Sequence, residues 1–191
     1  MSGPRTMRAD AQRNHDALVE VARRHLGSRG VSTSLEAIAR EAGVGVGTLY
    51  RHFPDRDHLL VAALNTPGQQ LRATATRIRD STPAATRLEQ WLPEVEHYLS
   101  SYQGLPDSIA HALDCGDDSP LTITCQEIIA LTDEFLTDTR AHGEVRAGVS
   151  GQALFEATLM LAWLGSQVTE DSHGLAGARD ILRHGYRVDR P

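Results

Sequence analysis

Lysine is absent from the sequence, and cysteine and aromatic residues are scarce. All 19 basic residues are arginine, which suggests a bacterial genome rich in G and C. The 2 cysteines, Cys115 and Cys125, are too few for a disulfide framework and lack zinc-site spacing, so a reducing cytoplasm is the expected compartment. No stretch approaches the about 20 apolar residues of a membrane span, and residues 1–10 lack the apolar segment of a secretory signal. We therefore expect a cytoplasmic protein without a membrane partner.

The common sequence signatures of catalysis are absent as well. There is no His-Glu-x-x-His pair, no phosphate-binding P-loop and no nucleophile elbow. Glu94-x-x-His97 occurs once, whereas a di-iron helical bundle needs two such pairs and two further carboxylates. Gly43, Gly45 and Gly47 follow a predicted helix instead of a strand, which argues against a dinucleotide-binding loop. We expect no metal, no cofactor and no enzymatic activity.

The charge is divided unevenly along the 191 residues, whose net charge is −6. Residues 1–65 carry nine arginines against seven acidic residues, and residues 66–191 carry ten arginines against eighteen acidic residues. The two balances are therefore +2 and −8. A basic end on an acidic body indicates a nucleic-acid partner at that end. Arginine suits such a partner because its planar, permanently charged fork matches phosphate and guanine.

Apolar residues recur at helical spacing through nearly the whole chain, and no segment reads as a strand, so the predicted fold class is all-α. Thr33 and Glu36 match a capping box, in which the two side chains satisfy free backbone N–H groups at a helix start. A break at Thr66-Pro67-Gly68 divides the chain into a 1–65 domain and a 66–191 domain. The predicted helices span about residues 10–28, 34–42, 46–52, Arg56 to the break, 69–80, 84–102, 106–114, 120–141, 150–168 and 174–187.

The most informative stretch is residues 33–60. Two short helices joined by a glycine-containing turn form a helix-turn-helix arrangement. In this arrangement the second helix enters the major groove of DNA, and its N-terminal residues meet the base edges. Here those residues are Val46, Gly47 and Thr48.

The same stretch contains a specific series of residues: Ile38-Ala39, Ala42-Gly43-Val44, Gly47-Thr48-Leu49-Tyr50, His52-Phe53 and Leu59-Leu60. With this series the chain resembles the N-terminal domain of TetR-family transcriptional repressors over about residues 10–64. The resemblance implies base and phosphate contacts from the start of the second helix, the turn, the third helix and the start of the fourth. The positions that carry these roles here are Thr33, Ser34, Gly45, Val46, Gly47, Thr48, Tyr50, Arg51, His52 and Arg56.

Two positions depart from the family's pattern. Gly45 stands where serine is common, so the turn loses a side-chain cap. Val46 stands where a polar or basic residue is frequent, and it offers only apolar contact, for example to a thymine methyl group. We therefore expect Arg51 to supply the guanine contact. Core packing of Tyr50 and a merely solvated His52 stay open as alternatives.

Two long helices near the C-terminus are the candidates for a homodimer interface. A single helix-turn-helix unit seldom holds a specific site, and a two-fold dimer reads the two halves of a palindrome. The resemblance implies a four-helix interface built from these helices, with packing inside one protomer as the alternative. The candidate residues are Leu154, Thr158, Leu161, Gly165, Val168, Ile181, Leu182 and Tyr186.

Aromatic and polar residues of the acidic body are the candidates for an effector pocket. Aromatic walls with a few polar groups are the usual composition of a small-molecule site, although each residue fits an ordinary core as well. Both tryptophans fall in this region, which favours an apolar or aromatic ligand. The candidates are Trp91, His97, Tyr98, Tyr102, His111, Cys125, Ile129, Phe135, Phe155, Leu159 and Trp163.

Together these features predict a homodimeric repressor that leaves a palindromic operator when a small apolar or aromatic ligand binds. Its expected partners are double-stranded DNA, a second copy of the chain and the effector. The alternative is a helical small-molecule carrier or enzyme whose DNA-binding heads are vestigial, and the departures at Gly45 and Val46 are what favour it.

Overall fold

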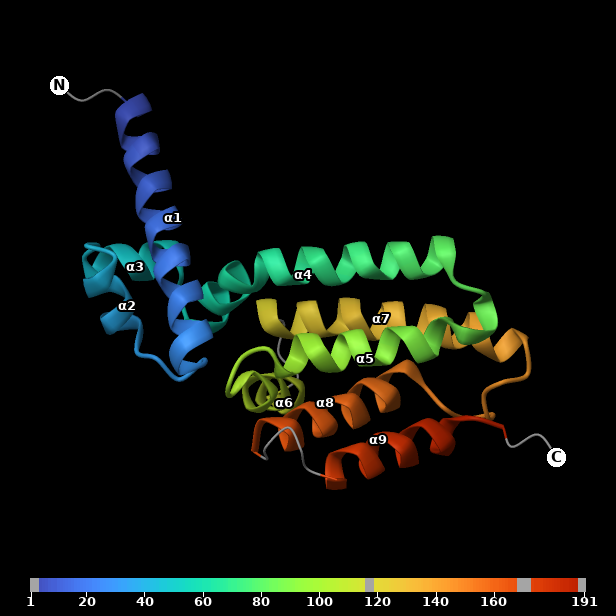
Figure 1. Cartoon of the computed structure of the whole chain (residues 1–191). Coiled ribbons are helices and arrows are strands. Elements are labelled where there is room, and N and C mark those ends of the chain that lie inside the picture. The colour runs from blue at the N-terminus through green and yellow to red at the C-terminus, as the bar shows by residue number, and fades with distance from the viewer. Residues whose placement is uncertain (1–3, 116–118, 168–172, 189–191) are drawn as a thin grey trace.

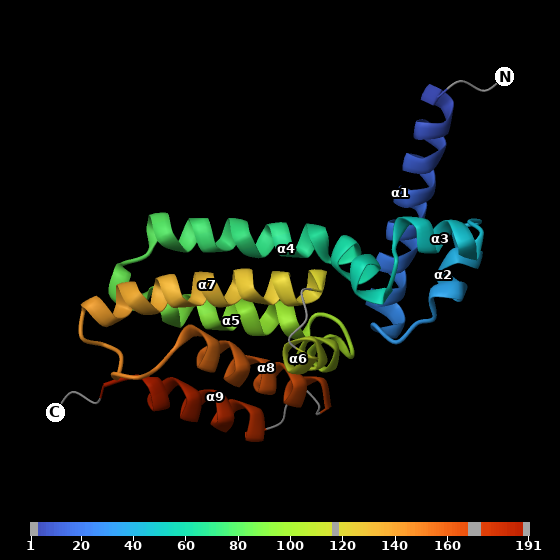
Figure 2. The same cartoon turned by 180° about the vertical axis from the view of Figure 1, so that it is seen from behind.

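The computed structural model describes residues 4–115, 119–167 and 173–188 of the chain, and it confirms the all-α fold. Figure 1 shows a small N-terminal group of helices beside a larger helical body, and Figure 2 shows the same arrangement from behind. In the described ranges, strand pairing is limited to one isolated antiparallel bridge between Val145 and Arg187. None of the described helices combines the length and apolar character needed to span a bilayer.

The N-terminal group consists of α1 (Pro4–Arg29), α2 (Leu35–Glu41) and α3 (Val46–His52). The first turns of α1 extend beyond the other two helices (Figure 1). The remainder of α1 packs against α2 and α3 through a shared apolar core, which fixes the two short helices relative to each other. That core includes Leu18, Leu26, Ile38, Leu49 and Phe53.

A buried histidine ties α1 to α2. Nε2 of His25 lies 2.6 Å from Oε2 of Glu41, and Nη2 of Arg24 lies 3.0 Å from Oε1 of the same carboxylate. The His25 hydrogen bond is the largest influence that lowers the pKa of Glu41, and the charges of His25 and Arg24 act in the same direction. The carboxylate therefore stays ionised and holds both helices.

The cap of α2 differs from the predicted capping box by one residue. Ser34 is the N-cap, and its Oγ accepts a hydrogen bond from the backbone N–H of Ala37 at 3.1 Å. Thr33 lies one position earlier, where its hydroxyl is buried and has no hydrogen-bond partner within the described residues. The capping role predicted for Thr33 is therefore wrong, because the helix begins one residue too late for its side chain to reach the free N–H groups.

Helix α4 (Arg56–Ser81) runs from the N-terminal group into the body, so the predicted helix break at Thr66-Pro67-Gly68 is wrong. Pro67 removes one backbone N–H from the helix. Leu64, Gly68 and Leu71 are nevertheless buried where α4 packs on α5 and α7, and this packing carries the helix through the proline. The division at residue 65 stays a prediction.

The body contains a short 3₁₀ turn, η1 (Ala84–Thr86), and five further helices. Its helices lie roughly along one another in Figures 1 and 2, except for α6, which is seen end-on. Pro93 lies inside α5 without ending it. The helices are α5 (Arg87–Ser100), α6 (Leu105–Cys115), α7 (Pro120–Ala141), α8 (Gly151–Gln167) and α9 (His173–Tyr186).

Large apolar side chains fill the centre of the body. Trp91 is fully buried, and its indole N–H donates to Oγ1 of Thr132 at 2.9 Å. The rings of Trp91 and Phe135 lie 5.5 Å apart at an interplanar angle of 61°, an edge-to-face contact. The hydrogen bond satisfies the polar atom of the indole, so its burial carries no unpaired donor.

The N-terminal group also touches the body through a close contact between two loops. The backbone N–H of Val31 donates to the carbonyl oxygen of Gln103 at 2.9 Å. Gly30 has φ +70°, and a Cβ atom placed there would lie 2.2 Å from that same oxygen. The contact therefore requires glycine for its backbone conformation and for the space it leaves.

Candidate nucleic-acid interface and body cavity

The exposed surface of α3 has the composition expected of a recognition helix. Val46, Gly47, Tyr50 and Arg51 are exposed, while Leu49 is fully buried and anchors the helix. The spacing of the four exposed residues places them on one face. Val46 leaves an apolar side chain 42% exposed, which suits contact with a thymine methyl group.

The charged and polar side chains along this face make few contacts within the described part of the protein. Arg51 is exposed and forms no ion pair with any described residue. The Tyr50 hydroxyl lies 3.4 Å from Oε1 of Glu36, a long hydrogen bond on the surface. A backbone hydrogen bond within Glu36 is the largest influence that lowers the pKa of its carboxyl, and Ser34 and Tyr50 contribute further hydrogen bonds. Core packing of Tyr50 is excluded by its exposure of 43%.

The turn before α3 behaves as its sequence predicts. Gly45 is the N-cap of α3 and makes no side-chain cap hydrogen bond. Its carbonyl oxygen accepts from the backbone N–H groups of Thr48 and Leu49 at 2.8 and 3.0 Å. Thr48 is half-buried at the start of the exposed face, and His52 is half-buried at the other end of α3. The His52 ring lies 6.0 Å from His15 and 6.3 Å from Phe53, so it packs partly against α1.

Two of the predicted DNA-contacting side chains are engaged or covered within the protein, although Arg56 as a residue is exposed. The Arg56 guanidinium donates to the carbonyl oxygens of Val31 and, at 3.0 Å, Thr33. Arg56 thus joins the start of α4 to the loop between α1 and α2. The Thr33 hydroxyl is buried, so it lies off the exposed face. Phosphate contacts by these two side chains therefore require them to turn away from their positions in this structure.

Four of the aromatic candidates for the effector pocket, Trp91, Tyr98, Phe135 and Phe155, form packed core. Burial raises the pKa values of the Tyr98 phenol and the Cys125 thiol to about 12, so both groups stay protonated in their apolar surroundings. Tyr102 and Ile129 are half-buried. The fully or nearly fully buried candidates are Trp91, Tyr98, Cys125, Phe135, Phe155 and Leu159.

The remaining candidates lie at the surface of the body. The Trp163 side chain is 46% exposed, and its indole N–H donates to Asp107 at 3.1 Å. His111 is exposed beside the equally exposed Cys115, with Nε2 and Sγ 3.6 Å apart. His97 is exposed on α5 and is the one effector candidate that lines the cavity described next.

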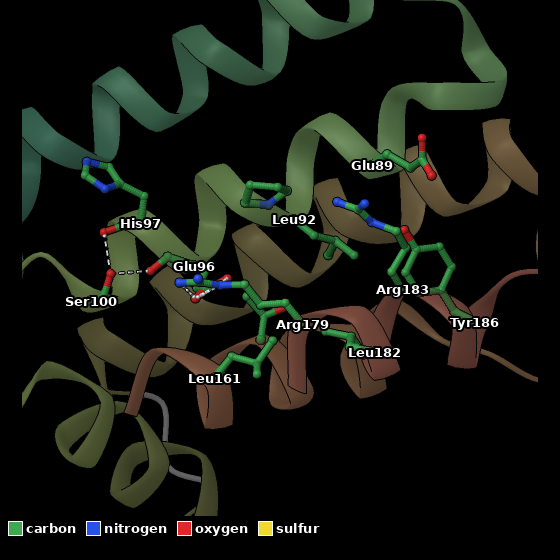
Figure 3. Close-up of a pocket in the computed structure, with 12 residues that line it drawn as sticks. Glu89, Leu92, Glu96, His97, Ser100, Leu161, Arg179, Leu182, Arg183 and Tyr186 are labelled. Atoms are coloured by element: carbon green, nitrogen blue, oxygen red, sulfur yellow. Dashed lines mark hydrogen bonds and ion pairs between the residues drawn. The ribbon is translucent and has the colours of Figure 1, made fainter. Parts of the chain in front are cut away.

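A cavity of about 240 Å³ lies between α5, α8 and α9 (Figure 3). Leu92 and Pro93 of α5, Leu161 of α8 and Leu182 of α9 supply its apolar surface. Its polar lining consists of Glu89, Glu96, His97, Ser100, Thr158, Arg179, Arg183 and Tyr186. Of the expected effector residues, His97 alone lines this cavity, which is bounded by aliphatic, charged and polar side chains together with Tyr186. The effector role of the other candidates stays a prediction.

The expected dimer stripe of α8 also faces inward. Leu154, Thr158 and Leu161 are buried against the protomer's own helices, and Gly165 lies close to Leu175 of α9. Leu154, Thr158 and Leu161 are therefore covered inside this protomer, where α5 and α7 pack on α8. Gly165 is only half-buried, so its assignment to a dimer surface stays a prediction.

On α9, Tyr186 is buried and Leu182 is half-buried, while Ile181 is 75% exposed. Of the α9 candidates, Ile181 is therefore the one that keeps an open apolar surface. Val168 lies outside the described residues.

Several residues of interest escaped sequence analysis. Met160 is 66% exposed, on the side of α8 opposite the buried stripe. Its exposure singles it out, because few large apolar residues are exposed among the described residues. Gln103 contacts the N-terminal group through its backbone, which no sequence pattern reveals. Arg179 forms a two-point ion pair with Glu96, 83 residues earlier in the chain. No group of three or more potential metal ligands gathers within the described residues.

Comparison with known proteins gives two matching family models. Bacterial regulatory proteins of the tetR family match residues 18–63, and the C-terminal domain of SbtR-like transcriptional regulators matches residues 83–188. An HTH-type transcriptional regulator of Staphylococcus aureus (strain USA300) is 44% identical over 54 residues, which are 28% of this chain and 29% of that protein. This similarity thus covers less than a third of the relative's length.

Solved structures share the arrangement of helices over nearly the whole chain. The TetR transcriptional regulator SCO0520 of Streptomyces coelicolor is 27% identical, with a TM-score of 0.59, and the match covers 92% of this chain and 99% of that one. A TetR-family regulator of Pectobacterium atrosepticum is 20% identical with a TM-score of 0.63, covering 96% and 99% of the two chains. SmeT in complex with triclosan is 18% identical with a TM-score of 0.58, covering 92% of each chain.

The two family models together span the helix-turn-helix unit and most of the body, and the first of these structures matches both parts at once. The chain therefore belongs to the TetR family of bacterial transcriptional regulators and is a DNA-binding regulator.

Proposed function

We propose that this regulator is a homodimeric repressor that binds a palindromic operator and is released by a small-molecule effector. The observation that carries the proposal is the exposed face of α3, where Val46, Tyr50 and Arg51 lie open on a helix anchored by Leu49. A protein whose heads served only as scaffold has no use for an unpaired arginine and an exposed valine on this face.

Each exposed side chain of α3 has a distinct role in this proposal. Arg51 forms two hydrogen bonds to a guanine, and Val46 contacts a thymine methyl group. Thr48 contacts a base edge, while Tyr50 and His52 contact phosphates beside the groove. Base contacts set the sequence preference, and phosphate contacts set the salt dependence.

The dimer surface is proposed to lie on the open side of α8 and α9. Met160, Trp163 and Ile181 are large apolar residues that remain exposed there in a single protomer. Exposed apolar residues of this size are favourable to bury against a second copy. The proposal thus keeps the two expected helices and replaces the buried residues of the α8 stripe with these three.

Effector release is proposed to act through the two connections between head and body. Helix α4 is continuous from Arg56 to Ser81, and the Val31–Gln103 hydrogen bond joins the head to the loop between α5 and α6. A ligand that binds one arrangement of the body better than another will shift these connections and thereby the spacing of the two heads. SmeT, which shares this fold, was solved as a complex with triclosan, so a protein of this fold binds a small molecule.

The proposal is tested by fluorescence anisotropy with the duplex that flanks the protein's own gene and with a random duplex. Arg51→Gln is expected to weaken binding to the flanking duplex by about 1–3 kcal/mol and to reduce its preference over random DNA. Tyr50→Phe is expected to weaken binding to both duplexes alike. Arg77→Gln is the control, since Arg77 is exposed on α4 and its side chain bonds only to Thr74 among the described residues. Equal affinity of the wild type for both duplexes would contradict the proposal.

A further inference from the structure

The cavity between α5, α8 and α9 holds two carboxylates, and both already have cationic partners. Oε1 of Glu96 lies 2.9 and 2.7 Å from Nε and Nη2 of Arg179, and the side chain of Glu96 is only 12% exposed. Glu89 pairs with Arg187, which also lies 3.4 Å from Glu144. The negative charges of the cavity lining are therefore neutralised within the protein.

One cation of the lining is left over. Arg183 is exposed and makes no hydrogen bond or ion pair with the residues that the structure describes. Figure 3 shows its side chain reaching from α9 toward Leu92 of α5. It lies in the last turn of α9, where the helix dipole favours positive charge. The lining thus carries two carboxylates and two guanidiniums, and Arg183 is the one of these four groups that has no ion pair among the described residues.

A second hydrogen-bond donor lies beside this guanidinium. Tyr186 lines the same end of the cavity, and its hydroxyl lies next to the Arg183 side chain in Figure 3. Burial raises the pKa of Tyr186 to about 12, and the nearby Arg183 charge opposes this rise. The phenol stays protonated and can donate to an anion.

The middle of the cavity is apolar, and the cavity is small. Leu92, Leu161 and Leu182 lie between the Arg183 end and the Ser100 end in Figure 3, and Pro93 also lines the cavity. Its volume of about 240 Å³ is below the roughly 300 Å³ at which typical drug-sized sites begin. A ligand of about ten non-hydrogen atoms matches this space, with one charged end and one short apolar part.

We propose that this cavity binds a small carboxylate with a short aliphatic or aromatic tail. Its carboxylate pairs with the Arg183 guanidinium and accepts from the Tyr186 hydroxyl, while its tail lies on Leu92, Leu161 and Leu182. The bound ligand contacts α9 through its carboxylate and α5 through its tail, so it stabilises one position of α9. Helix α9 is also proposed to form part of the dimer surface. Its action as the effector rests on the proposed function, whereas binding itself does not.

A cation of the same size is the competing ligand class. It would have to displace Arg179 from the two-point contact with Glu96, and it would be repelled by Arg183. A neutral ligand would leave Arg183 without a partner. The charge of the probe is therefore the property that decides the proposal.

The test is calorimetric titration of the purified full chain with three probes of matched length: octanoate, 1-octanol and octylamine. Octanoate is expected to bind once per protomer, at least tenfold more tightly than the other two probes. Arg183→Gln is expected to weaken octanoate binding about tenfold, because it removes one charge-assisted contact at a partly exposed site. Arg77→Gln is the matched control and should leave the affinity unchanged, because Arg77 lies on α4 outside the cavity.

A second pair of variants tests the position of the ligand. Leu161→Phe and Leu182→Phe both fill the cavity, and either one that keeps the wild-type circular dichroism spectrum should abolish octanoate binding. The proposal is overturned by tighter binding of octylamine, by octanoate affinity independent of Arg183, by binding that survives a filled cavity, or by no binding of octanoate to the wild type.

DNA release is measured separately, so the site and the regulatory function can fail independently. Adding octanoate to the wild-type complex with flanking DNA should lower the anisotropy, and the Arg183→Gln complex should need about tenfold more octanoate. Binding through Arg183 without release would overturn the effector role. A wild type that does not prefer the flanking DNA would instead contradict the proposed function and leave the titration result standing.

Discussion

Substitution of Gly30 by alanine should break the loop contact between the N-terminal group and the body. The cost in free energy of unfolding can be worked out from the structure. Gly30 has φ +70°, and an added Cβ would lie 2.2 Å from the Gln103 carbonyl oxygen. The left-handed backbone costs alanine about 1 kcal/mol. The oxygen must also move away, which breaks its 2.9 Å hydrogen bond from Val31 and leaves the Val31 N–H without this partner, at a cost of about 2 kcal/mol. Gly30→Ala should therefore destabilise the protein by about 3 kcal/mol.

Two other glycines provide matched controls. Gly43 has φ +68° but has open space at the Cβ position, so Gly43→Ala should cost about 1 kcal/mol from backbone conformation alone. Gly27 lies inside α1 with open space around it, so Gly27→Ala should stabilise the protein by about 0.5–1 kcal/mol. The difference between the Gly30 and Gly43 variants isolates the loop contact.

Urea unfolding followed by circular dichroism measures all three free energies under one set of conditions. The Gly30 variant should also melt roughly 6–12 °C lower than the wild type, as expected for a domain of this size. Equal destabilisation by Gly30→Ala and Gly43→Ala would refute the reasoning, because the close approach of Gln103 would then cost nothing. Stabilisation by Gly30→Ala would refute the left-handed conformation as well.

Four further predictions concern the core, the thiols and the recognition helix. Trp91→Ala should lower the free energy of unfolding by about 3–5 kcal/mol in urea, because it empties a fully buried site and removes the N–H that donates to the Thr132 hydroxyl. Cys125, whose pKa burial raises to about 12, should stay unreactive toward a thiol reagent at pH 8 in the folded protein, where the exposed Cys115 reacts. The pKa of Cys125 is higher in the folded than in the unfolded chain, so its contribution to stability is complete below about pH 9 and is lost as the pH rises toward 12. The midpoint of urea unfolding should therefore be lower at pH 10.5 than at pH 8. Thr48→Ala should change the order of preference among operator variants in a competition assay, and equal losses on specific and random DNA would contradict its base contact.

The fold of the N-terminal helix-turn-helix part could be predicted from sequence because its signals are local. The positions of Val46, Tyr50 and Arg51 on the open side of α3 follow from helical spacing and from Leu49 facing inward. The capping-box pattern places the N-cap at Thr33 because Glu36 lies three residues later, whereas the helix takes the adjacent hydroxyl residue, Ser34, as its N-cap. Local pattern sets the helix, and only the backbone geometry chooses between the two caps.

The surfaces of the body could not be predicted in the same way. An apolar stripe such as Leu154, Thr158 and Leu161 indicates that one side of a helix is buried, but it does not say whether its own protomer or a partner buries it. Large aromatic side chains such as Trp91 fill space efficiently and therefore end up in the core. The cavity arises where α9 meets α5 through the distant pair Glu96 and Arg179, and no local spacing connects these residues.

Nuclease footprinting of the wild-type protein on the DNA flanking its own gene tests the central claim most directly. The account predicts a protected region containing an inverted repeat, with half-site centres one helical turn of DNA, about 34–36 Å, or a multiple of it, apart and two-fold symmetric protection. Titration on that sequence should saturate at a whole number of dimers. Protection without symmetry, or uniform weak protection along the whole fragment, would contradict a dimeric regulator that reads a palindrome with α3.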